Sequence, residues 1–321
     1  MLHSLQLLGI APSTRRTYHS GLMRFQHFCS LYHLRPLPAS SLTLRYFCAF
    51  LSLSVRHSTI KLYLSAIRFH HIENHYTDPT HDTLLQYTLK GIKRTQCTST
   101  KPRLPLTINI LRSLKAALHM STTLTLNDKR MLWAAFCTAF YGFLRASELC
   151  SPTRHSFDPT STLCASDVTI TPTAVHISLK ASKTDPFRQG CTITLGATST
   201  STCPVAALTK YMSTSPTTPT SPLFHFNDNS YLTRDSLTTH LRTLLAAAGY
   251  DPDSYASHSF RIGAATTAAS AGLPDWQIQA MGRWSSDCYT RYIRTPPTIL
   301  AQASRRLAAH DTQGRYSQWK C

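Results

Sequence analysis

The sequence predicts a mainly α-helical protein with a small β-sheet, an α+β fold divided into two domains. Three observations support this prediction. Apolar residues recur at three- and four-residue spacing over most of the chain. One pair of alternating runs near residue 180 is typical of a β-hairpin. A stretch without apolar periodicity separates residues 1–96 from residues 106–321, and 321 residues are enough for two hydrophobic cores.

The first domain is predicted to be a bundle of four helices. The first helix begins near Ser13 or Thr14, either of which is a candidate N-cap. Its apolar residues share one face: Tyr18, Leu22, Phe25, Phe28 and Tyr32. Similar patterns predict helices over 41–53, 58–74 and 81–93. Four helices of this length are sufficient for a small bundle.

The segment 97–105, CTSTKPRLP, is predicted to be a linker because it combines small polar residues with two prolines. Helical patterns follow it over 108–118 and 129–140, and then a turn-like stretch, YGFLRASEL. The second domain therefore begins with helices.

Alternating runs at 174–179 and 191–195 flank the loop KASKTDPFRQG, which predicts a β-hairpin with lysines near its tip. From Pro204 onward the patterns are mostly helical, separated by loops rich in Ser, Thr and Pro. The second domain is therefore predicted to be mainly helical and to carry one small sheet.

The charge of the chain points to a polyanionic partner. It has 33 Lys and Arg against 15 Asp and Glu, and a pI of about 9.7. Residues 1–103 alone hold thirteen basic and three acidic residues, which is typical of a surface that contacts a phosphate backbone. An ordinary soluble surface usually mixes both signs. The candidate DNA-binding residues are Arg15, Arg16, Arg24, Lys61, Arg68, Lys90, Lys93 and Arg94.

Cysteine and histidine spacing argues against a disulfide framework and against a metal site. The ten cysteines are widely spaced without a CxxC pair, and the sixteen histidines lack the paired spacing of a tetrahedral site. No apolar run approaches the roughly 20 residues of a membrane span, and the first residues do not resemble a signal peptide. We expect an intracellular protein without metal, cofactor or membrane contact.

Four cations in separated segments are suited to hold a phosphate: Arg145, Lys183, His258 and Arg261. His258 and Arg261 are three residues apart, so they share one helix face and can contact the same group. Each residue also has a simpler interpretation. Arg145 would form an ion pair with Glu148 three residues later. Lys183 would be a solvated hairpin residue, and His258 would be a helix cap.

The stretch MGRWSSDCYTRYIR, residues 281–294, places Tyr289 and Tyr292 among arginines near a single acid, Asp287. A tyrosine hydroxyl has a pKa of about 10 and is a poor nucleophile. Positive charge near a phosphate favours the phenolate and the transition state together. Guanidinium groups can supply that charge in place of a metal ion. The alternative is that both tyrosines only pack.

The strings RASEL, SKTD, HSFR, GRW and YIR follow one another in an order that resembles the tyrosine recombinases, the phage-integrase family. In detail, HSFRIGAAT and GRWSSD…YIR are similar to the recombinases of eukaryotic DIRS-like and Crypton-like mobile elements. The resemblance covers both domains. It implies that the first is a helical core-binding (SAM-like) domain and the second is the catalytic domain.

The resemblance implies a role for each cation. Arg145 and Arg261 would bind the non-bridging oxygens of the scissile phosphate, and Glu148 would orient the first arginine and the histidine. Lys183 would protonate the leaving 5′ oxygen. His258 would support acid–base transfer.

Trp284 would fill the position that is His or Trp in the family. The nucleophile usually follows nine residues later, whereas here Tyr292 is eight residues after Trp284 and Tyr289 is five. We favour Tyr292 because YIR matches the family's nucleophile context, and Tyr289 remains the alternative nucleophile. Lys180 also lies near the hairpin, and the SKTD context favours Lys183.

The resemblance implies a site-specific DNA recombinase that cuts and rejoins strands through a 3′-phosphotyrosyl intermediate and acts as a homotetramer on double-stranded DNA. It also implies action in the nucleus of a eukaryotic host. Two alternatives remain: an inactive DNA-binding protein derived from a mobile element, and a type IB topoisomerase-like enzyme. A metal-dependent nuclease is disfavoured because acidic residues are scarce and separated. The target site is left open, as is the choice between integration, excision and inversion.

Overall fold

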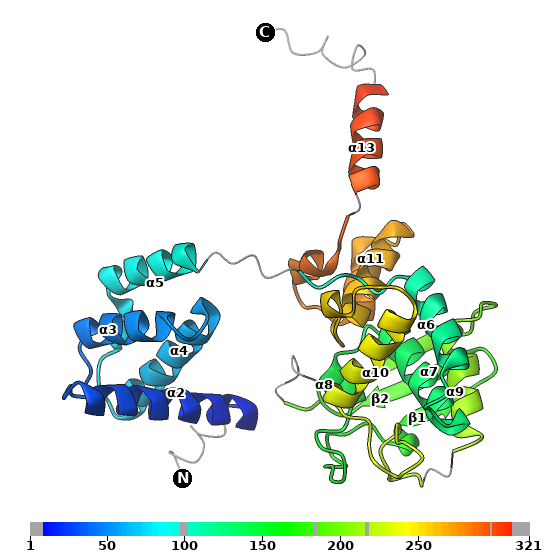
Figure 1. Cartoon of the computed structure of the whole chain (residues 1–321), viewed down its shortest axis with the longest axis horizontal. Coiled ribbons are helices and arrows are strands. Elements are labelled where there is room, and N and C mark those ends of the chain that lie inside the picture. Colours follow the sequence, from blue (N-terminus) through cyan, green and yellow to red (C-terminus); the bar gives the residue numbers. More distant parts are fainter. Residues whose placement is uncertain are drawn as a thin grey trace. The chain divides into compact units, whose positions relative to one another are not determined.

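The computed structural model describes residues 9–96, 102–182, 185, 187–215, 218–295 and 297–309. The chain divides into two compact units, Met1–Thr100 and Lys101–Cys321. Figure 1 shows helices throughout both units and the strands in the second unit alone. The predicted mainly helical fold with one small sheet is confirmed.

The first unit is a bundle of α2 (Pro12–Leu31), α3 (Ser41–Ser52), α4 (His57–Glu73) and α5 (Thr83–Thr95), with a 3-10 turn η1 (Pro79–His81) before α5. The predicted helices lie within a few residues of these bounds. The core of this unit is aromatic at its centre: Phe25, Phe28 and Phe47 are each at most 2% exposed, and both Phe25 and Phe28 contact Phe47.

The prediction of the first N-cap was wrong. α2 begins at Pro12, one residue before Ser13, and its N-cap is Ala11, which makes no side-chain hydrogen bond. Proline is favoured at the first helical position, where its missing N–H needs no partner. The helix therefore starts ahead of the hydroxyl residues that were expected to cap it.

The second unit contains eight α-helices and three 3-10 turns within its described residues. The α-helices are α6 (Ile108–Met120), α7 (Leu126–Tyr141), α8 (Ala146–Leu149), α9 (Pro204–Met212), α10 (Arg234–Ala247), α11 (Ser259–Ser270), α12 (Asp275–Gly282) and α13 (Pro297–Ala309). The turns are η2 (Ala165–Asp167), η3 (Pro252–Ser254) and η4 (Asp287–Tyr292).

The sheet has three antiparallel strands in the order β1 (Val168–Ile170), β2 (Ala174–Leu179), β3 (Cys191–Gly196). The predicted hairpin is confirmed as β2 and β3. β1 was not predicted, because three residues are too few to show an alternating pattern. Val175, Ile177 and Leu179 are buried at alternate positions of β2, so one face of the sheet packs into the helical core.

Helix α11 lies deep in the second unit and contacts α7, α12 and η4. A Cβ on Gly263 would lie 1.9 Å from the carbonyl oxygen of Leu106, so glycine permits α11 to approach the segment before α6. That segment is hydrogen-bonded to the start of α11, because the Leu106 N–H donates to the Ser259 carbonyl at 3.0 Å. The segment before α6 is thus attached to the start of α11, next to His258.

The eight cysteines that the structure describes are free thiols, and six of them are buried. Across the described ranges, no helix has both the length and the apolar character needed to cross a membrane.

Candidate active site

Arg261 on α11 is the centre of the candidate site and is fully buried. Its guanidinium donates to the carbonyl oxygens of Phe143 and Gly282. Its Cζ lies 4.2 Å from the ring centroid of Trp284 and 5.5 Å from that of Tyr292. No acidic residue forms an ion pair with Arg261 among the described residues. Burial and the nearby positive charges of other arginines lower the pKa of Arg261 to about 10.

Arg145 and Glu148 are held together at the short helix α8. Glu148 accepts from the Arg145 backbone N–H at 2.9 Å and from its guanidinium at 2.7 Å. A second guanidinium, that of Arg283, donates to the other carboxylate oxygen at 2.8 Å. The ion pair that was the simpler interpretation of Arg145 therefore exists. Arg145 also lies close enough to Arg261 to lower the pKa of Arg261.

Trp284 packs against Arg261 because the preceding chain makes room for its ring. A Cβ on Gly282 would lie 1.7 Å from that ring, so glycine is required there. Trp284 is 8% exposed, and its indole N–H has no acceptor among the described residues. The Nε–H groups of Arg261 and Arg283 are also buried without an acceptor in the part of the chain that the structure describes. Buried donors of this kind are normally paired. The cluster of Arg261, Arg283 and Trp284 therefore holds N–H donors for which the described residues supply no acceptor.

His258 directly precedes α11, but its side chain caps nothing. Its ring centroid lies 5.2 Å from that of Tyr292. Contact with the protein interior and the positive charges of Arg261 and Arg145 lower the pKa of His258. Its ring still reaches solvent. His258 is therefore neutral at pH 7 and has a nitrogen lone pair available to accept a proton.

The two candidate tyrosines occupy different environments on η4. Tyr292 is half-buried, with its ring centroid 5.0 Å from that of Trp284. Tyr289 is 5% exposed, and burial together with the Asp275 carboxylate raises its pKa. Thr266 on α11 fixes the end of η4, because its hydroxyl donates to the Tyr292 carbonyl at 3.2 Å and accepts from the Arg294 N–H at 3.0 Å.

The structure thus brings together six residues predicted from the sequence: Arg145, Glu148, His258, Arg261, Trp284 and Tyr292. They come from the start of α8, from the start of α11, from the segment that follows α12, and from η4.

Comparison with known proteins gives a curated relative. No protein-family model matches the chain. This chain is 25% identical over 311 residues to an integrase/recombinase xerD homolog of Selenomonas ruminantium, and the match covers 92% of this chain and 86% of the relative. The chain therefore resembles the tyrosine recombinase/integrase family in sequence over most of its length.

Solved structures of recombinases share the fold. The XerH site-specific recombinase bound to palindromic difH substrate in a post-cleavage complex matches with a TM-score of 0.65 at 16% identity, over 91% of this chain and 79% of that chain. A Tn1549 transposon integrase in complex with transposon right end DNA matches with a TM-score of 0.60 at 15% identity, over 96% and 98%. A lambda integrase dimer bound to a COC′ core site matches with a TM-score of 0.58 at 15% identity, over 89% and 72%.

Lys183 lies outside the described residues. The other hairpin lysine, Lys180, is already engaged: its ammonium donates to Asp167 at 2.7 Å and to the Pro159 carbonyl at 2.9 Å. Although partial burial disfavours the charged form, the Asp167 carboxylate raises the pKa of Lys180. Lys180 is therefore held away from a role in proton donation, and Lys183 remains the prediction.

The predicted DNA-binding residues lie on three helices of the first unit. Arg15, Arg16 and Arg24 lie on α2, Lys61 and Arg68 on α4, and Lys90, Lys93 and Arg94 on α5. All are exposed except Arg15, which is half-buried. Arg68 forms an ion pair with Asp78 at 2.7 Å, and Lys90 lies over the ring of Tyr87. Arg68 is therefore partly neutralised within the unit.

Arg283 is a site residue that the sequence reasoning did not single out. It was noted only within the string GRW, and its partner Glu148 is 135 residues away in sequence. Its one local signal was a cation placed directly between Gly282 and Trp284.

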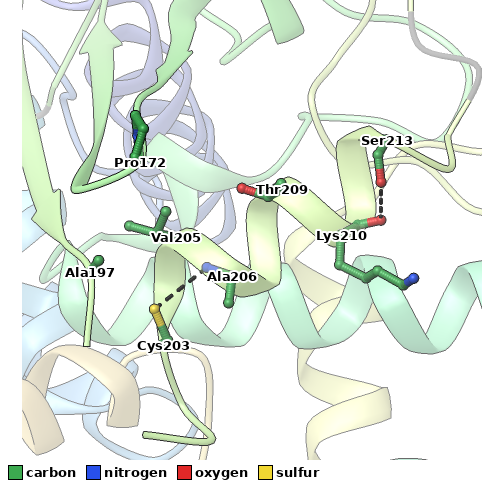
Figure 2. Close-up of a pocket in the computed structure, with 8 residues that line it drawn as sticks. All are labelled: Pro172, Ala197, Cys203, Val205, Ala206, Thr209, Lys210 and Ser213. Atoms are coloured by element: carbon green, nitrogen blue, oxygen red, sulfur yellow. Dashed lines mark hydrogen bonds between the residues drawn. The ribbon is translucent and has the colours of Figure 1, made fainter. Parts of the chain in front are cut away.

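A hollow of about 460 Å³ lies elsewhere in the second unit, between α9 and the sheet (Figure 2). Its lining is mainly apolar, with Lys210 as the charged member and the Cys203 thiol accepting from the Ala206 N–H. None of the six clustered site residues lines it. The described residues contain no group of three His, Cys, Asp or Glu arranged to hold a metal ion.

Proposed function

We propose that this chain is a site-specific DNA recombinase that cuts and rejoins DNA strands through a 3′-phosphotyrosyl intermediate on Tyr292. One observation carries the proposal. A half-buried tyrosine lies against a fully buried arginine that has no acidic partner among the described residues, beside buried N–H donors without acceptors. A phosphodiester supplies both the negative charge and the acceptor oxygens that this cluster lacks.

In the proposed reaction the Tyr292 hydroxyl oxygen attacks the phosphorus atom. The bond from phosphorus to the 5′ oxygen breaks, the phosphate becomes a 3′-phosphotyrosine, and the 5′ oxygen leaves with a proton as a hydroxyl. Arg145 and Arg261 neutralise the non-bridging oxygens, where charge accumulates. Because the intermediate remains a phosphodiester, the 5′ hydroxyl of another strand can reverse the step without ATP.

Two residues are proposed to move protons. His258 is the proposed acceptor of the tyrosine proton, since its lowered pKa keeps it neutral and its ring lies beside Tyr292. Lys183 is the proposed donor to the leaving 5′ oxygen. The guanidinium charges take the place of a metal ion in this scheme, so we propose that strand cleavage needs neither metal nor cofactor.

Double-stranded DNA is the proposed partner, contacted by the basic helices of the first unit and by the site of the second. A homotetramer on two aligned sites is the proposed active assembly. Likeness to a Tn1549 transposon integrase supports integration or excision of a mobile element as the setting. The sequence resemblance to DIRS-like and Crypton-like recombinases makes such an element, acting in a eukaryotic nucleus, the specific form of this proposal.

Recovery of the covalent intermediate tests the proposal. Full-length protein is isolated from expressing cells under denaturing conditions, and part of the attached DNA is sequenced. The rest is digested with nuclease, and tryptic peptides are examined by mass spectrometry. We expect a nucleotide remnant on Tyr292 in the peptide YIR, allowing for a missed cleavage, and unchanged yield after incubation of lysates with EDTA.

An adduct on Tyr289 in WSSDCYTR would preserve the reaction and overturn the assignment of the nucleophile. Absence of any adduct, while a known tyrosine recombinase yields one in the same cells, would overturn the catalytic proposal and favour a non-catalytic DNA-binding protein. Relaxation of supercoils without recombinant products would instead favour a topoisomerase-like activity.

A further inference from the structure

Arg283 adopts an unusual backbone conformation in order to place its side chain. It ends α12 with φ 55° and ψ 48°, in the left-handed region that residues other than glycine seldom occupy. Its guanidinium donates to the carbonyls of Gly142 at 3.0 Å and Met281 at 3.3 Å, and to Glu148 at 2.8 Å. A conformation of this kind persists where the surroundings determine it at several points.

Glu148 is shared between two guanidinium groups. Its side chain is 1% exposed, with Oε1 accepting from Arg145 and Oε2 accepting from Arg283. A buried carboxylate that loses its sole cation is strongly destabilised. If Arg145 were the only cation beside Glu148, drawing its guanidinium toward a DNA phosphate would leave such a carboxylate. Arg283 prevents that outcome.

The two arginines differ in how firmly they are held. Arg283 is fixed by backbone carbonyls as well as by Glu148. Within the described ranges, the Arg145 guanidinium has Glu148 as its hydrogen-bond acceptor. Arg145 is thus the arginine that can turn toward a phosphate, and Arg283 is the one that stays with the carboxylate.

We propose that Arg283 is a positioning residue, which holds Glu148 paired so that the Arg145 guanidinium becomes available to the scissile phosphate. This inference rests on the proposed function. Arg283 also joins the loop that anchors Arg261, since both guanidiniums donate toward the Phe143 carbonyl, Arg283 at 3.5 Å. One side chain thereby sets the positions of both phosphate-binding arginines.

A double-mutant cycle between Arg283 and Glu148 tests the inference. The substrate is a nicked duplex oligonucleotide carrying the sequence recovered from the wild-type adducts. Single-turnover adduct formation, DNA affinity and the unfolding temperature are measured for the full-length wild type, Arg283→Met, Arg283→Lys, Glu148→Gln and the double variant Glu148→Gln/Arg283→Met. Arg112→Met is the matched control, because Arg112 is an exposed arginine of α6 whose guanidinium contacts Asn109 of the same helix.

We expect Arg283→Met to slow adduct formation by at least about tenfold, because the lone Glu148 then retains Arg145. In the double variant the neutral amide that replaces the Glu148 carboxylate no longer needs a cation. The rate of the double variant should therefore lie within about threefold of that of Glu148→Gln alone. Arg283→Lys should recover part of the rate, and Arg112→Met should match the wild type.

A wild-type rate for Arg283→Met would overturn the inference. The inference would also be overturned if the rate losses of Arg283→Met and Glu148→Gln multiplied in the double variant. Independent effects of this kind would indicate that Arg283 acts by general structural support. If Arg283→Met fails to fold, the rates of Arg283→Lys and of the double variant Glu148→Gln/Arg283→Lys are compared instead, and the same two results would overturn the inference. Absence of adducts from the wild type is a separate result, which overturns the proposed function itself.

Discussion

Replacing Gly282 by alanine should disable the site without straining the backbone. Gly282 does not adopt a positive φ, so alanine is compatible with its conformation. Its new Cβ would lie 1.7 Å from the Trp284 ring. Non-bonded carbon atoms are ordinarily about 3.5–4 Å apart, so the ring must move by roughly 2 Å.

The magnitude follows from what the displaced ring loses. Its contact with the Arg261 guanidinium, at 4.2 Å, contributes about 2 kcal/mol when desolvated. Its indole N–H, which we expect to donate to the phosphate, contributes up to about 2 kcal/mol more. A loss of about 2–4 kcal/mol in the transition state slows the chemical step roughly thirty- to thousandfold.

The assay is single-turnover adduct formation on the recovered duplex, with Gly196→Ala as the control. An ideal Cβ on Gly196, at the end of β3, meets no atom within 4 Å. Trp284→Ala and the double variant Gly282→Ala/Trp284→Ala should be equally slow, since the three atoms nearest to the new Cβ all belong to the Trp284 ring. A wild-type rate for Gly282→Ala would refute the reasoning, as would a double variant much slower than Trp284→Ala.

Three further outcomes are expected. Tyr292→Phe should abolish the adduct because the attacking oxygen is gone, whereas Tyr289→Phe should retain it and lose only stability, as mass spectrometry and thermal unfolding would show. Burial and neighbouring arginines lower the pKa of His258, so the unfolded chain binds its proton more readily as pH falls below about 6.5. The unfolding temperature of the wild type should therefore decline more steeply below that pH than that of His258→Gln, and parallel declines would contradict this. Arg24→Ala should reduce the slope of log affinity for duplex DNA against log salt by about 1. Arg68→Ala should change this slope less, because Arg68 is already paired with Asp78.

The helices and the hairpin were predictable because their signals are local. Apolar residues at helical spacing, such as Phe25 and Phe28, predict amphipathic helices from the local sequence alone. In β2, more buried and less buried residues alternate along the strand. The start of α2 was missed because Pro12 competes with the hydroxyl residues after it. β1 was missed because it exists only through its pairing with β2.

The candidate site was predictable where its residues lie in recognisable strings, as Arg145, His258 and Arg261 do. Neither composition nor spacing indicates that Glu148 accepts from an arginine 135 residues away. The different burial of Tyr289 and Tyr292 was likewise hidden, since both occupy one short 3-10 turn and only tertiary contacts, such as that of His258 with Tyr292, distinguish them. Charge and motif therefore predicted six of the residues that the structure brings together, while tertiary contacts determined their pairing.

The attachment of Leu106 to Ser259 has a practical consequence for chimaeric proteins. Because the first unit is proposed to contact DNA, its exchange between relatives would test whether it sets the target, and the start of α6 is the obvious graft point. A junction there would replace Leu106, although its backbone is bonded to the start of α11 and lies against Gly263. Joining the two sequences before Pro102 keeps this contact native, so a chimaera built that way should inherit an undamaged α11.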